Sequence, residues 1–112
     1  MTLPLGEVVL IRMKFHQAAG SRFRPAVVVL DTGDEDFVAA PITSRARHSE
    51  YDFPLEDWQG AGLDVASNNR VHKLTVLAKA DIISRLARLS ERDHENLLLL
   101  LCRVFCESAI GT

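Results

Sequence analysis

Three polar side chains in this sequence are suited to chemistry on a phosphate group or a hydroxyl group. Arg24 carries a planar, permanently charged guanidinium that matches two oxygens of a phosphate. Thr43 has a hydroxyl that can donate to such a group, and His72 carries an imidazole, a group that can accept or release a proton. Structural alternatives stay open from the sequence alone. These are a surface ion pair for Arg24, a turn hydrogen bond for Thr43 and a solvent-facing strand position for His72.

The elements around Arg24 and Thr43 predict that both residues lie at one end of a hairpin. Residues 26–30 are a β-branched run that is typical of a strand buried on both faces. A turn signal follows, and a second strand begins at Phe37 and ends near Thr43. Arg24 enters this hairpin after a predicted loop over residues 16–23, and Thr43 leaves it. The side chains are therefore expected to share a site.

Further short strands are expected on either side of this hairpin. Alternating or apolar patterns predict them over residues 7–15, 51–55 and 66–77, with Pro54 favouring a sheet edge. Residues 82–89 fit either a strand or a helix, because their two arginines are three positions apart but follow the preceding strand closely.

The end of the chain gives the clearest helix signal. Ser90 is a favourable N-cap, and Asp93 stands where the acid of a capping box would be. A wide apolar face continues from Glu91 to about Glu107. We therefore expect one domain over residues 1–112, mainly β, in which an antiparallel barrel or roll is followed by a C-terminal helix.

Charge is nearly balanced overall but unevenly distributed. The formal net charge of −2 excludes a globally basic nucleic-acid binder. Basic residues dominate the first 30 positions and those after residue 66, while acids dominate between them. This distribution is compatible with a local basic groove, with Trp58 in a Gly-bearing loop as a stacking or partner contact. The candidate phosphate contacts are Arg22, Arg45, Arg47, Arg70 and Lys73, of which Arg70 would share a strand face with His72.

The two cysteines indicate a reducing compartment and no metal site. Cys102 and Cys106 are four positions apart in an apolar run, so we expect reduced core residues on one helix face. No histidines or acids are interleaved with them as metal ligands would be. There is no signal-peptide pattern, and the apolar run over residues 97–102 is too short for a membrane span. A cytoplasmic protein without membrane contact is expected.

Several segments, taken in order, resemble the PemK/MazF family of toxins from type II toxin–antitoxin systems. The resemblance extends over about residues 6–107, and its order and spacing are more specific than any one motif. The segments that carry it are Gly6–Ile11, Arg24–Leu30, Pro41–Ser44 and Asn69–Leu74, followed by residues 83–93.

The resemblance implies a fold, an activity and partners. The family has an SH3-like β-barrel, commonly forms homodimers, and is held inactive by an antitoxin protein. Contact with DNA is expected only through that antitoxin. Its active members are endoribonucleases, or mRNA interferases, that cut single-stranded RNA without a metal or other cofactor. The catalytic residues of the family carry over onto Arg24 and Thr43, and a substrate contact carries over onto Ser44. His72 stands where members often have an acid.

Cleavage without metal would use the neighbouring 2′-hydroxyl as the nucleophile and leave a 2′,3′-cyclic phosphate. Arg24 would stabilise the phosphorane, and His72 is the candidate for proton transfer. The alternative is a non-catalytic, growth-inhibiting module of the same barrel fold that acts on a protein target such as gyrase. Gyrase-poisoning toxins of this fold rely on their C-terminal residues. The C-terminal end of this sequence is short, which argues against that alternative.

Overall fold

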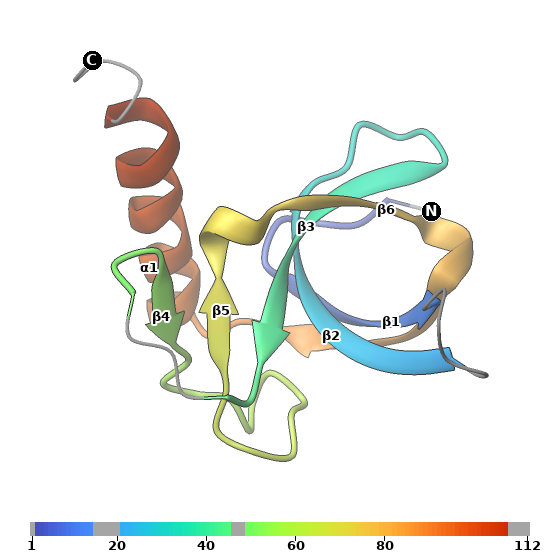
Figure 1. The fold of residues 1–112 in the computed structure, drawn as a ribbon, viewed down its shortest axis with the longest axis horizontal. Coiled ribbons are helices and arrows are strands. Elements are labelled where there is room, and N and C mark those ends of the chain that lie inside the picture. The colour runs from blue at the N-terminus through green and yellow to red at the C-terminus, as the bar shows by residue number, and fades with distance from the viewer. Residues whose placement is uncertain (1, 15–20, 46–48, 108–112) are drawn as a thin grey trace.

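The computed structural model describes residues 2–14, 21–45 and 49–107. In these ranges a strongly curved β-sheet is followed by one α-helix that lies beside its short strands (Figure 1). The strands are β1 (Glu7–Lys14), β2 (Ser21–Leu30), β3 (Asp36–Thr43), β4 (Asp52–Pro54), β5 (Asn68–Arg70), β6 (Thr75–Ala78) and β7 (Ile82–Arg88). The helix is α1 (Glu91–Leu101), and short helical turns cover Val71–Lys73, Lys79–Asp81 and Cys102–Glu107.

The sheet is antiparallel, with the strand order β4-β5-β3-β2-β1-β7. β6 lies off this path and pairs with the first half of β3. No pairing joins β4 to β7 among the described residues, so the barrel-like sheet is open. The prediction of an antiparallel, barrel-like sheet with a C-terminal helix is confirmed, and Pro54 does lie in an edge strand.

The predicted hairpin is formed by β2 and β3, with Ala26 opposite Pro41 and Val28 opposite Ala39. Its first strand begins earlier than expected. Residues 21–23, predicted as loop, belong to β2 because they continue the pairing with β1, where Arg12 faces Phe23. Pro25 is tolerated inside this strand, since the pairing with β3 begins only at Ala26.

Both faces of β1 and β2 are buried. This confirms the prediction that residues 26–30 form a strand buried on both faces, except at Leu30, whose side chain is exposed. On one face Val8 and Val27 belong to a cluster that includes Leu97 of the helix. On the other face, their neighbours Val9 and Val28 pack in a separate cluster. Successive side chains of a strand point to opposite faces, so each strand contributes to two cores.

Residues 66–77 do not form one strand as predicted. β5 pairs with the end of β3 at Ile42 and Thr43, whereas β6 pairs with residues 36–39 at its beginning. The 3₁₀ turn Val71–Lys73 moves the chain between these two stretches of the same partner strand, with the Val71 side chain fully buried.

Residues 82–89, which fitted either element, form β7 up to Arg88, because they pair with β1. Ser90 caps the helix as predicted, its hydroxyl accepting the Asp93 N–H at 3.2 Å. Asp93 has a different function from the one expected. Its fully buried carboxylate accepts the N–H groups of Glu56 and Asp57 at 2.9 and 3.0 Å, which ties the loop after β4 to the start of α1.

Cys102 and Cys106 carry free thiols, but the prediction that they are core residues is wrong. Both are exposed, because they lie in the π-helical turns Cys102–Glu107, in which no side chain is buried. No helix among the described residues is long and apolar enough to cross a membrane.

Candidate functional site

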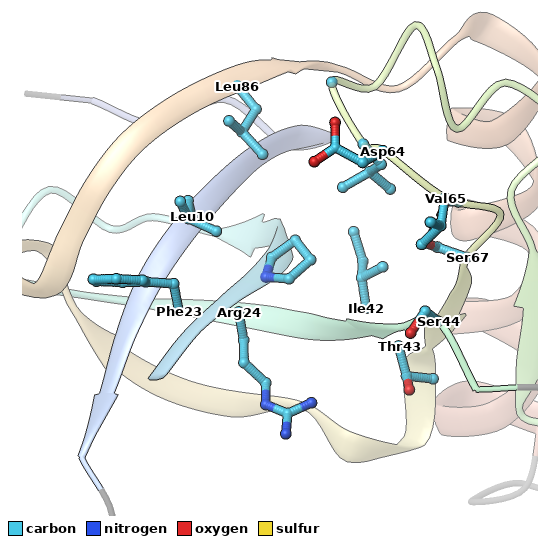
Figure 2. Close-up of a pocket in the computed structure, with 13 residues that line it drawn as sticks. Leu10, Phe23, Arg24, Ile42, Thr43, Ser44, Asp64, Val65, Ser67 and Leu86 are labelled. Carbon is cyan, nitrogen blue, oxygen red and sulfur yellow. The ribbon is translucent and has the colours of Figure 1, made fainter. Parts of the chain in front are cut away.

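An open cleft of about 350 Å³ lies at the end of the β2–β3 hairpin (Figure 2). It continues the core cluster on the helix side of the sheet, because Ile42 belongs to both. One wall is formed by β2 and β3, and the other by β7 and the loop over residues 62–67. The lining residues are Leu10, Phe23, Arg24, Pro25, Ile42, Thr43, Ser44, Gly62, Leu63, Asp64, Val65, Ser67 and Leu86.

Arg24 and Thr43 are positioned by the register of the hairpin. Ala26 faces Pro41, and continuing the register by two residues sets Arg24 opposite Thr43. Directly opposed side chains lie on the same face of a sheet. Figure 2 accordingly shows both side chains extending in the same direction from one rim of the cleft. The two residues thus line the same cleft.

The Arg24 guanidinium is available to a ligand. The side chain is exposed, and it forms no ion pair or hydrogen bond with any residue that the structure describes. The alternative of a surface ion pair is therefore not observed within those ranges. A guanidinium in this state is a strong site for an anionic group with two oxygens.

The Thr43 hydroxyl belongs to a tight turn. Its Oγ1 accepts the Arg45 N–H at 3.2 Å, and Asn68 Nδ2 donates to the Arg45 carbonyl at 3.2 Å. The turn hydrogen bond that the sequence left open thus exists. It uses only the oxygen as an acceptor, and no residue that the structure describes accepts the hydroxyl proton. Ser44, the next residue, also lines the cleft.

His72 and Arg70 lie outside this cleft, in a second polar cluster. Arg70 Nε donates to the almost fully buried Asp52 carboxylate at 3.3 Å, and Arg70 Nη2 is 3.5 Å from His72 Nε2. The ring of Tyr51 packs beside His72 with centroids 5.3 Å apart. Arg70 and His72 are neighbours as expected. The 3₁₀ turn brings them together, not the shared strand face that was predicted.

The other predicted phosphate contacts are not gathered around the cleft. Arg22, Arg45 and Lys73 are exposed but do not line it. Arg47 lies outside the described residues. Trp58 is half-buried and packs against the helix-side core. The large aromatic ring that lines the cleft is instead Phe23, which is 54% exposed.

One cleft residue was not singled out by the sequence. Asp64 lies on the wall opposite Arg24, and Figure 2 shows its carboxylate pointing into the cleft. A single acid in a polar loop gives no periodic or motif signal, so no pattern in the sequence could distinguish it from its neighbours. No group of three or more potential metal ligands occurs among the described residues.

The sequence matches a known family over most of its length. The profile of the family described as "PemK-like, MazF-like toxin of type II toxin-antitoxin system" matches residues 5–105. No curated protein sequence matches the chain.

Solved structures share the fold at low sequence identity. "Mycobacterium tuberculosis toxin MazF-mt6" has a TM-score of 0.72 and 14% identity, with 88% of this chain and 95% of that chain covered. The MazE–MazF complex from Deinococcus radiodurans has a TM-score of 0.71 and 20% identity, with coverages of 96% and 95%. "Endoribonuclease in complex with its cognate antitoxin from Mycobacterial species" has a TM-score of 0.67 and 17% identity, with coverages of 97% and 96%. At these identities the likeness concerns the fold alone.

Proposed function

The chain belongs to the PemK-like, MazF-like toxin family of type II toxin–antitoxin systems, and on this basis we propose that it is a metal-independent endoribonuclease that cuts single-stranded RNA and so inhibits translation and growth. The observation that carries the proposal is that Arg24 and Thr43 lie together at one rim of an open cleft. Two structures of the same fold are named as endoribonucleases, which is consistent with this activity.

The proposed chemistry follows from the groups that the cleft provides. The 2′-hydroxyl of the substrate attacks the adjacent phosphate and the bond to the 5′-oxygen breaks. The proton of the 2′-hydroxyl passes to solvent water and the departing 5′-oxygen takes one from it, which leaves a 2′,3′-cyclic phosphate and a 5′-hydroxyl. Arg24 neutralises the charge on the phosphorane oxygens, and the Thr43 hydroxyl donates a hydrogen bond to one of them. Ser44 contacts the backbone next to this phosphate. His72 lies outside the cleft, so the proposal assigns it no proton-transfer step.

The test is RNA cleavage by the purified protein in EDTA. We expect cleavage with a 2′,3′-cyclic phosphate end, and Arg24→Ala should lower kcat/KM by about a hundredfold or more, as loss of a single transition-state donor does. The matched control is Arg92→Ala, since Arg92 is a surface arginine of α1 that pairs with Glu56 of the loop after β4. Cleavage that requires a metal, or an Arg24→Ala variant with undiminished activity, would contradict the proposal. Arrested growth with intact cellular RNA would favour action on a protein target such as gyrase.

The proposed partners are single-stranded RNA, a cognate antitoxin and a second copy of the chain. One solved structure with this fold is named as a complex with its cognate antitoxin, and another as a MazE–MazF complex. An acidic antitoxin segment would compete with RNA for the Arg24 guanidinium, because both present anionic oxygens. Leu98, Leu99 and Phe105 are exposed along the helical end of the chain and offer an apolar surface for association.

A further inference from the structure

The cleft is polar in opposite senses on its two walls. At the hairpin rim Arg24 and Thr43 provide a cation and a hydroxyl donor that extend outward from the cleft, whereas the Asp64 carboxylate points into it from the loop side. Asp64 is exposed and forms no hydrogen bond or ion pair with any residue that the structure describes. Both of its oxygens are therefore open to a ligand.

The loop that carries Asp64 is held in place on both sides. Gly62 has φ +86°, and a Cβ at this position would lie 2.9 Å from Leu86 Cβ, so the loop packs closely against β7. The Leu63 N–H donates to the Trp58 carbonyl at 3.1 Å. On the other side, Ser67 Oγ donates to the Val65 carbonyl at 2.8 Å. Asp64 is thus presented by a supported backbone, which favours selective recognition.

A carboxylate in this place repels phosphate and attracts the donor edge of a base. Adenine and cytosine each place a ring acceptor beside their amino group, and uracil flanks its imino group with two carbonyls. Guanine alone offers two adjacent donors, N1–H and the 2-amino group, which match the two oxygens of a carboxylate. The Watson–Crick edges of unpaired bases are open to such contacts in single-stranded RNA.

We propose that Asp64 makes this cleft select guanine in the RNA segment whose phosphate is held by Arg24. The proposal rests on the proposed endoribonuclease function. Phe23 supplies a second element of a base site, because its exposed ring lines the same cleft next to Arg24. Stacking accepts any base, so the choice among bases falls to the carboxylate.

The experiment compares guanine with inosine, which lacks only the 2-amino group. Cleavage sites of the wild-type protein are first mapped on a long RNA, where a guanine is expected at a fixed position relative to the cut. In a short substrate, replacing that guanine by inosine should lower kcat/KM by about tenfold to a hundredfold, the range for one well-placed base contact. The Asp64→Asn variant should cut the guanine and inosine substrates at nearly equal rates. The control is Glu95→Gln, an exposed acid on α1, which should keep the wild-type ratio.

The outcomes separate this inference from the proposed function. Wild-type cleavage without a fixed guanine, or an Asp64→Asn variant that keeps the guanine-to-inosine ratio, overturns the role of Asp64 and leaves the endoribonuclease intact. If the wild-type protein cuts no RNA, the proposed function fails. In that case, binding of 2′-O-methyl oligonucleotides that contain guanine or inosine still decides whether Asp64 selects the base.

Discussion

Thr43 combines a structural and a chemical capacity in one hydroxyl group. Its oxygen accepts the Arg45 N–H and so fixes the turn that follows β3, while no described residue accepts its proton. Arg24, directly across the hairpin, has no such internal partner among the described residues. The two side chains therefore differ in how substitution should affect them.

Two substitutions separate the capacities of Thr43. Thr43→Ser keeps the hydroxyl, and we expect it to retain most of the RNA cleavage activity. Thr43→Val keeps the shape but removes both hydrogen bonds, and should lower kcat/KM by about tenfold or more, as loss of a hydrogen bond to a charged group does. Thr75→Val, at an exposed position of β6, controls for the loss of a threonine. Wild-type rates for Thr43→Val would exclude the hydroxyl from the reaction.

At the residue scale, the sequence predicts contacts that lie within one hairpin better than contacts that depend on distant strands. Arg24, Thr43 and Ser44 meet because a β-branched run and a turn signal define the hairpin. The sequence also predicts that His72 and Arg70 are neighbours, as the structure shows. The separation of His72 from Arg24, however, depends on β5 and β6 pairing with different stretches of β3. No local pattern encodes that change of pairing.

At the scale of elements, the loop between β4 and β5 forms a wall of the cleft although it has no regular structure. It is anchored at its start by the Asp93 carboxylate of the helix and in its middle by Gly62, which packs against β7. The sequence identified Ser90 as the cap but could not show that Asp93 turns toward this loop. An acid in the first turn of a helix can serve either its own cap or a neighbouring backbone.

Gly62 and Gly33 form a matched pair for testing the loop. Both have positive φ, +86° and +96°, but a Cβ at Gly33 meets nothing within 4 Å. Gly33→Ala should cost only the strain of a left-handed residue, about 1–2 kcal/mol of unfolding free energy. Gly62→Ala must also displace Leu86 and should cost about 1–3 kcal/mol more, as overpacking does. Urea unfolding measures both, and equal losses would show that the contact with β7 is unimportant.

At the scale of the whole molecule, Asp31 joins the start of the chain to the sheet. Its buried carboxylate pairs with Lys79 Nζ at 2.8 Å and accepts the N–H groups of Leu3 at 2.7 Å and Gly33 at 2.8 Å. The Lys79 hydrogen bond, followed by those from Leu3 and Gly33, lowers the pKa of Asp31 from 3.8 to about 2. The ionised form is thus favoured in the folded state.

This shift predicts how stability depends on pH. The folded pKa is below the unfolded one, so the contribution of Asp31 is complete above pH 3.8 and is lost as the pH falls through that value toward about 2. Asp31→Asn should lower the unfolding free energy at pH 7 and show a smaller further loss between these pH values. Urea unfolding across this range tests the prediction. Asp64→Asn, which removes an exposed carboxylate without a partner in the described residues, should behave like the wild type.

The pairing of β1 with β7 also sets the order in time in which the cleft can form. Leu10 and Leu86 line the same cleft, yet they come from strands near opposite ends of the sequence. A chain that is still being synthesised carries Arg24 and Thr43 long before β7 exists, and closing so long a loop delays the last pairing further. The cleft is thus among the last parts of the described fold to be completed. An emerging chain therefore presents Arg24 and Thr43 to its surroundings before the cleft between the hairpin and β7 exists.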